Sequence, residues 1–79
     1  MKTKYLEQFG LHFRTLRQGK NLSQEALAEK AGMHRTYIGM IEHGERNPAL
    51  LNLKRLADAL EIPLTDLVNF PFKENHETH

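Results

Sequence analysis

Residues 22–48 read LSQEALAEKAGMHRTYIGMIEHGERNP and contain two short helical patterns separated by a glycine. The first pattern begins after Ser23, whose hydroxyl can accept a hydrogen bond from an unpaired backbone N–H of the first turn. It ends at Gly32, because glycine readily adopts the left-handed backbone conformation that commonly closes a helix. The second pattern begins near His34 and ends at Gly44. The segment therefore predicts two helices joined by a tight turn.

Three further helices are predicted from the spacing of apolar residues on either side of this segment. Upstream, one apolar face of a helix that ends at Gly19 is formed by Leu6, Phe9, Phe13 and Leu16. Downstream, a helix broken by Pro63 carries an apolar stripe formed by Leu50, Leu53, Leu56, Ala57 and Leu60. A short fifth helix is predicted from Leu64 to Phe70. We expect an all-α fold, a compact bundle of five short helices that contains a helix-turn-helix.

The whole chain is expected to form one domain over residues 1–72. Residues 73–79, KENHETH, contain no apolar residue and predict a disordered polar tail. A chain of 79 residues is small, and such a domain buries only roughly 60% of the surface that its unfolded form exposes. Its stability is therefore expected to be marginal, and association with a second subunit would raise it.

Composition and charge narrow the class of protein. The chain has no cysteine, which excludes disulfides and thiolate metal sites. No apolar run has the length of a signal peptide or a membrane span, so a cytoplasmic protein is expected. Residues 1–48 carry eight Lys and Arg against five Asp and Glu, whereas residues 49–79 carry three against five. The basic half is where a polyanion is expected to bind.

The glycine-linked pair of helices carries particular residues at particular positions. Ala28 is small enough to let two helices cross closely, and Ile38 and Ile41 are spaced to face a core. The full set comprises residues 22–28, Gly32, residues 35–38, Ile41, Glu42, Gly44 and residues 46–48. This set resembles the phage repressor/Cro (XRE-type) family of helix-turn-helix transcriptional regulators, over about residues 16–67. Within that family, residues 34–48 are most similar to the controller proteins of restriction-modification systems.

The resemblance implies that the second helix of the pair lies in the major groove of double-stranded DNA. The residues expected to face the bases are His34, Arg35, Thr36, Gly39 and Met40. Arg35 is the first candidate, because its guanidinium can donate two hydrogen bonds to guanine O6 and N7, worth about 1–3 kcal/mol of discrimination. Thr36 is expected to contact a thymine methyl or a base acceptor. Many relatives have a hydroxyl or amide residue at Gly39 and Met40, so recognition there is expected to use apolar contact or DNA shape.

A second group of residues is expected to contact the DNA backbone: Ser23, Gln24, Tyr37, His43, Arg46 and Asn47. Gln24 stands at the start of a helix, where its side chain and the helix N-terminus would bind a phosphate. For Tyr37 the sequence supports equally a phosphate contact and partial burial with the hydroxyl at the surface. Arg46 is expected to contact the backbone or to enter the minor groove.

The resemblance also implies a structural ion pair between Arg17 on the first helix and Glu42 at the end of the third. Its expected role is to hold the recognition helix on the scaffold. If the pair is partly buried, removing one partner would leave the other charge uncompensated, which costs about 3–5 kcal/mol.

The apolar residues near the C-terminus have two interpretations, as lids over the core or as a patch for a second subunit. They are Leu64, Leu67, Val68, Phe70 and Phe72. We favour the patch, because a domain this small contacts only a few base pairs. Useful affinity then requires two copies on half-sites about 34 Å apart. The sequence predicts a homodimer that binds a pseudo-palindromic operator. The resemblance further suggests that this homodimer controls a restriction-modification system.

The sequence gives less support to other functions. The chain has no nucleophile motif, phosphate-binding glycine loop or paired carboxylates, so neither an enzyme nor a cofactor is expected. His34 and His43 lie nine residues apart without a clustered carboxylate, and His76 and His79 lie in the tail, so no physiological metal is expected. The rival function is an antitoxin-type protein-interaction module that regulates its own gene, but a seven-residue tail gives little material to wrap a toxin. An RNA-binding or purely structural bundle is the third alternative.

Overall fold

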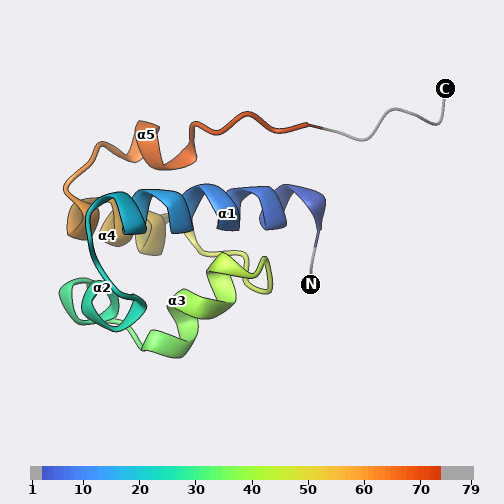
Figure 1. Cartoon of the computed structure of the whole chain (residues 1–79). Helices are drawn as coiled ribbons and strands as arrows, with labels where there is room; N and C mark the ends of the chain where they lie inside the picture. The colour runs from blue at the N-terminus through green and yellow to red at the C-terminus, as the bar shows by residue number, and fades with distance from the viewer. Residues whose placement is uncertain (1–2, 74–79) are drawn as a thin grey trace, which may run out of the picture.

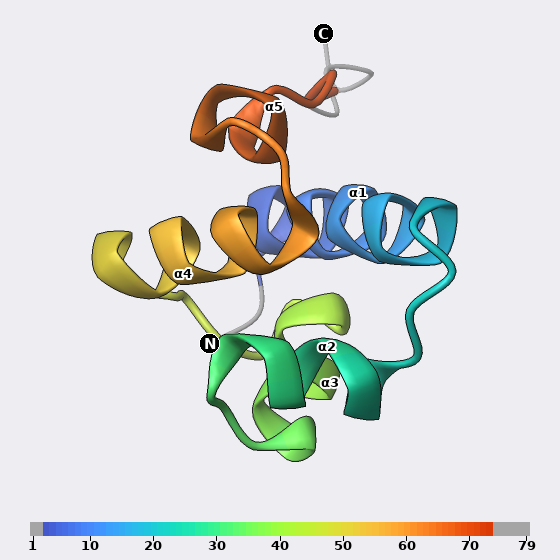
Figure 2. The same ribbon diagram turned by 90° about the vertical axis from the view of Figure 1, so that its left-hand side faces the viewer.

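The computed structural model describes residues 3–73, and these residues form five α-helices. The helices are α1 (Lys4–Gly19), α2 (Gln24–Ala31), α3 (Arg35–Glu42), α4 (Leu50–Leu60) and α5 (Leu64–Val68). Helix α1 lies in the middle, with α2 and α3 on one side and α5 on the other (Figures 1 and 2). The predicted all-α bundle is confirmed. No helix within residues 3–73 combines the length and the apolar character that a membrane crossing requires.

The ends of α2 follow the local chemistry predicted from the sequence. The Ser23 hydroxyl accepts a hydrogen bond from the backbone N–H of Ala26 at 2.9 Å. At the other end, Gly32 has a φ of 68°, and the N–H of Met33 donates to the carbonyl of Ala28 at 2.9 Å. The left-handed glycine lets the chain turn into α3 after only three residues.

The C-terminal helices end differently from the prediction. Helix α4 ends at Leu60, where Glu61 takes a left-handed conformation with a φ of 60° before Pro63 is reached. Helix α5 ends at Val68 rather than Phe70. The physical reason is Pro71, because a proline disfavours helical backbone at the residue before it.

The core receives buried side chains from all five helices. Its fully buried large side chains are Phe13, Leu27, Ile38, Ile41, Leu56, Leu60 and Leu67. Leu50, predicted to belong to the apolar stripe of α4, is 69% exposed, and Leu51 beside it is 77% exposed. The prediction for Leu50 was wrong because the first turn of α4 projects beyond the helices that cover its later turns (Figure 2).

Residues 69–73, called the C-terminal segment below, run along α1 on the side away from α2 and α3 (Figure 1). The Tyr5 ring lies 5.0 Å from the ring of Phe70 and 5.0 Å from that of Phe72, measured between centroids. The Gln8 amide donates to the carbonyl of Lys73 at 2.9 Å and accepts from its N–H at 3.0 Å. The expected disordered tail was therefore wrong for Lys73, while residues 74–79 lie outside the described residues.

Candidate nucleic-acid interface

Helix α3 has one apolar face and one polar face. Ile38 and Ile41 are fully buried on the inner face. At the start of the helix, His34, Arg35 and Thr36 are exposed, while Gly39 and Met40 further along it are half-buried. The structure therefore places all five residues predicted to face the bases on α3 and its N-cap. The side chains of Arg35 and Thr36 are accessible to a ligand.

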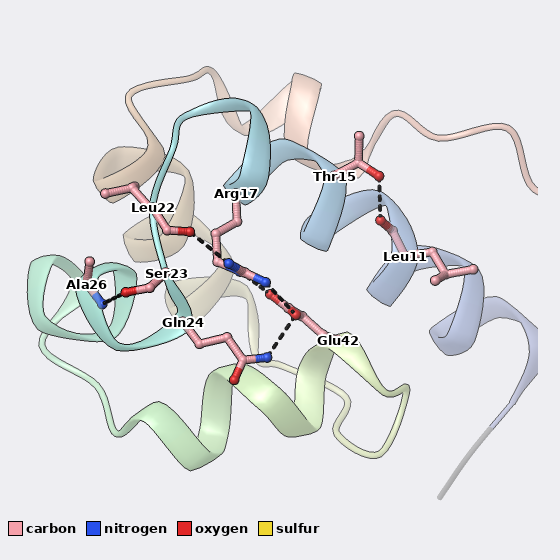
Figure 3. Close-up of polar contacts among 8 residues, drawn as sticks. All are labelled: Leu11, Thr15, Arg17, Leu22, Ser23, Gln24, Ala26 and Glu42. Atoms are coloured by element: carbon pink, nitrogen blue, oxygen red, sulfur yellow. Dashed lines mark hydrogen bonds and ion pairs between the residues drawn. The ribbon is translucent and has the colours of Figure 1, made fainter.

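The end of α3 is held to α1 by the ion pair of Arg17 and Glu42 (Figure 3). Arg17 Nε donates to Glu42 Oε2 at 2.6 Å, and Nη2 donates to Oε1 at 3.1 Å. The two side chains are only 9% and 2% exposed. The third guanidinium nitrogen, Nη1, donates to the carbonyl of Leu22 at 2.7 Å, just before α2. One guanidinium therefore contacts α3 and the segment that leads into α2, and this fixes α3 in distance and in rotation.

Gln24 belongs to the same polar cluster. Its Nε2 donates to Glu42 Oε1 at 3.0 Å (Figure 3). A Cβ on Gly39 would lie 3.6 Å from Gln24 Oε1, so the amide lies beside the bare backbone of α3. An amide nitrogen carries two N–H donors, and only one of them is used on Glu42. The side chain predicted to contact a phosphate is thus half-buried and positioned by Glu42.

Two glycines allow α1 and the end of α3 to approach closely. A Cβ on Gly10 would lie 2.6 Å from the carbonyl oxygen of Ile41 and would also clash with that of Glu42. Gly44 has a φ of 74°, and a Cβ there would lie 2.9 Å from Glu7 Cα. The sequence analysis found the second of these glycines as a helix end but missed the role of Gly10, because a helix contact between distant residues leaves no local pattern.

The remaining residues predicted to contact the DNA backbone are Tyr37 and three residues between α3 and α4: His43, Arg46 and Asn47. The Tyr37 ring is half-buried against the core, and its hydroxyl accepts a hydrogen bond from Asn52 Nδ2 at 3.1 Å. The Arg46 guanidinium carbon lies 5.6 Å from the centroid of the same ring. His43 and Asn47 are exposed on the same connection between α3 and α4. The structure therefore brings together Tyr37 and Arg46, and it adds Asn52, which the sequence analysis missed.

Comparison with known proteins identifies the family. A family model described as helix-turn-helix matches residues 13–67. The chain belongs to the helix-turn-helix family. The control protein C.BamHI of Bacillus amyloliquefaciens is 44% identical over 63 residues, which cover 78% of either chain. The restriction-modification controller protein C.AhdI from Aeromonas hydrophila has a solved structure with 47% identity and a TM-score of 0.77, covering 78% of this chain and 94% of that one.

A second solved structure, the biofilm regulator SinR in complex with DNA, has 29% identity and a TM-score of 0.73. It covers 77% of this chain and 98% of its own. The resemblance to XRE-type regulators, and within them to restriction-modification controller proteins, is confirmed by these matches.

Arg55 is a further residue that the sequence analysis missed. It lies on α4 outside the apolar stripe, and its Nη2 donates to the carbonyls of Ala31 and Gly32 at 2.8 and 3.0 Å. These carbonyls lack partners within α2 because Ala31 is its last residue and Gly32 is its C-cap. Arg55 therefore holds the turn of the helix-turn-helix on α4.

The predicted apolar patch for a second subunit is corrected by the structure. Leu67 is fully buried in the core, so its assignment to an interface was wrong. Leu64 and Phe70 are half-buried against the core, and Phe72 is half-buried beside Tyr5. Of the five residues, Val68 alone is exposed. The reason is that α5 and the C-terminal segment lie flat on the rest of the bundle, so that their apolar side chains act as lids.

No group of three or more His, Cys, Asp or Glu residues that could hold a metal ion is found within residues 3–73. His76 and His79 lie outside the described residues.

Proposed function

We propose that this helix-turn-helix protein is a transcriptional regulator that binds a pseudo-palindromic DNA operator as a homodimer. Helix α3 would lie in the major groove, with Arg35 and Thr36 against base edges. The observation that carries the proposal is that these exposed side chains stand on a helix whose far end is fixed by the buried pair of Arg17 and Glu42. Recognition of bases by hydrogen bonds requires such a fixed support, because hydrogen bonds weaken steeply with distance and angle.

The similarity to controller proteins supports a more specific role, control of a restriction-modification system. Since the ligand is chromosomal or plasmid DNA, the protein would act in the cytoplasm. Its activity would be binding alone, without a catalysed reaction.

The proposed contacts are divided between the bases and the backbone of the DNA. Direct base contacts would come from His34, Arg35, Thr36, Gly39 and Met40. Backbone contacts would come from Ser23, Gln24, Tyr37, His43, Arg46 and Asn47. Phosphate contacts set the register of the protein, whereas base contacts carry the sequence information.

The homodimer would use a surface that shares Val68 and Phe70 with the patch suggested by the sequence and adds the exposed first turn of α4. The first turn of α4 exposes Leu50 and Leu51, and Leu53, one turn after Leu50, lines a small cleft of about 140 Å³. Tyr5 and Val68, both exposed, line the same cleft. An apolar surface of this kind is costly to leave in water on so small a domain. We expect a second copy of the chain to cover it.

The proposed operator binding is tested by selecting bound duplexes from a random library with the purified protein. We expect an enriched motif with two-fold symmetry, and affinity that falls by roughly 10³–10⁵ between about 50 and 200 mM salt if about 6–10 phosphates are contacted. Absence of any enrichment, or of binding at low ionic strength, would contradict the proposal.

The proposed roles are separated by two variants measured on the selected duplex and on its single-base variants. Arg35→Ala should relax base preference at one position per half-site, whereas Gln24→Ala should weaken binding to all sequences alike. Identical specificity profiles for Arg35→Ala and the unsubstituted protein would remove Arg35 from base recognition.

The dimer surface is tested by sedimentation of Leu51→Glu, with Leu11→Glu as the matched control. Both leucines are exposed, but Leu11 lies on α1 beside the C-terminal segment. We expect Leu51→Glu alone to shift the protein to monomer. Dissociation by Leu11→Glu instead would place the interface elsewhere.

A further inference from the structure

The contact of Asn52 with Tyr37 determines which way the tyrosine hydroxyl can donate. A phenolic hydroxyl has one proton to donate and lone pairs that accept. In the structure the oxygen accepts from Asn52 Nδ2 at 3.1 Å. Within residues 3–73 this is the only hydrogen bond of the hydroxyl. The tyrosine proton is therefore left for an acceptor outside residues 3–73.

The surroundings of this proton favour an anionic acceptor. Tyr37 and Asn52 line an open groove of about 420 Å³ between the start of α3 and α4, and Arg46 and Arg55 line it as well. The Arg46 guanidinium lies over the Tyr37 ring, 5.6 Å from its centroid. No carboxylate is among the lining residues. A hydroxyl donor beside guanidinium groups matches the oxygen of a phosphodiester.

We infer that Asn52 is a positioning residue for DNA binding: by donating to the Tyr37 oxygen, it directs the tyrosine proton toward a phosphodiester of the DNA. This inference rests on the proposed function and names a residue of α4 that takes no part in the expected contacts. Arg46 supplies charge to the same site, whereas Tyr37 supplies a neutral and directional hydrogen bond.

The inference is tested by a double-mutant cycle with Asn52→Ala and Tyr37→Phe, measured on the duplex that the unsubstituted protein selects. A hydrogen bond to a charged group justifies an expected loss of roughly tenfold per half-site for Tyr37→Phe. Asn52→Ala should lose about threefold in the unsubstituted protein and less than about twofold when combined with Tyr37→Phe. Equal losses in both backgrounds would overturn the inference.

The direction of the hydrogen bond is tested by Asn52→Asp, which replaces the donor by an acceptor of the same shape. The tyrosine proton would then turn to the carboxylate, so binding should fall further than for Asn52→Ala. In the Tyr37→Phe background this excess should shrink to the repulsion between the carboxylate and DNA. An excess of the same size in both backgrounds would contradict the proposed direction.

A salt titration separates this role from a general effect on charge. Each lost ionic phosphate contact lowers the slope of log affinity against log salt by about 0.9. Asn52→Ala and Tyr37→Phe should weaken binding without changing this slope, whereas Arg46→Ala should lower it. Asn69→Ala, an amide removed from the exposed end of α5, is the matched control and should change neither quantity.

Failure of this inference differs from failure of the proposed function. If the protein selects a duplex but the cycle shows no coupling, Asn52 has no positioning role and the regulator assignment stands. If no duplex is selected or bound, the proposed function itself is wrong.

Discussion

Helix α1 is contacted on two sides by two kinds of interaction. On the side of α3, it contributes the buried guanidinium of Arg17, paired with Glu42, and the bare backbone of Gly10. On the side of α5 and the C-terminal segment, it contributes the rings of Tyr5 and Phe9, which lie 5.0 and 5.8 Å from that of Phe70. One side is polar and closely fitted, and the other is aromatic and partly exposed.

The difference shows how a small domain can divide orientation from stability. A bidentate pair of guanidinium and carboxylate fixes angle as well as distance, so it specifies how α3 is rotated. Aromatic packing tolerates several arrangements, because offset and edge-to-face pairs have similar energies. We therefore expect substitutions on the α3 side to affect folding and base preference together, and substitutions on the α5 side to affect stability and dimerisation without changing base preference.

The largest effect is expected for Arg17→Met, which leaves the Glu42 carboxylate buried without a partner. The free energy of unfolding should fall by about 3–5 kcal/mol. Urea unfolding followed by circular dichroism measures this change. The double variant Arg17→Met with Glu42→Leu is the control and should recover part of the loss, since no unpaired charge remains. A loss below about 1 kcal/mol for the single variant would mean that the pair is solvated.

Gly10→Ala comes next, with an expected loss of about 3 kcal/mol, at the upper end for an overpacked site. Its added methyl meets backbone atoms of Ile41 and Glu42, which cannot rotate away. Gly19→Ala is the matched control, because a Cβ at Gly19 has nothing within 4 Å. Alanine there should leave stability unchanged or raise it by up to about 1 kcal/mol. Equal thermal unfolding midpoints for the two variants would contradict the close approach of α1 and α3.

On the aromatic side, Phe70→Ala should lower the free energy of unfolding by about 2 kcal/mol, less than for a fully buried ring. The variant should keep the base preference of the unsubstituted protein at temperatures where it is folded. Urea unfolding and binding to the selected duplex measure the two quantities. A changed base preference would show that the aromatic side also controls the orientation of α3.

The smallest effect is expected for the two helix N-caps, Thr3 and Ser23, whose hydroxyls accept from the N–H of Leu6 and Ala26. Thr3→Ala and Ser23→Ala should each cost about 1 kcal/mol of stability. Only Ser23→Ala should also weaken DNA binding, because α2 begins beside the proposed interface. Equal binding by the two variants would exclude Ser23 from the DNA contacts.

Much of the polar side was predictable from the sequence, because its information is local or carried by the resemblance. Ser23 and Gly32 indicate the two ends of α2, because a serine hydroxyl caps a helix N-terminus and a glycine readily takes the left-handed conformation that closes a helix. The pair of Arg17 and Glu42, separated by 25 residues, was inferred from the resemblance and is present in the structure. The five residues expected to face the bases lie on α3 and its N-cap, although their contacts with DNA stay a prediction.

The contacts that escaped prediction join residues with no shared periodicity. Gln8 and Lys73 are 65 residues apart, and Arg55 contacts carbonyls 23 and 24 residues away. Leu67 was assigned to an interface because apolar spacing shows that a helix has an inner face, but not whether a subunit or the core covers it. The prediction for Leu50 was wrong for a different reason: the first turn of α4 extends past the neighbouring helices, so this side chain of the apolar stripe is exposed.

The bare backbone of Gly10 has a mechanical consequence for the complex. Because the backbone of α1 lies directly against the last carbonyls of α3, the recognition helix cannot shift toward α1 when it meets DNA. The protein and the DNA must then adapt to each other through side-chain rotamers and through distortion of the duplex. Operators containing easily kinked steps such as TA or CA would be bound with less deformation energy.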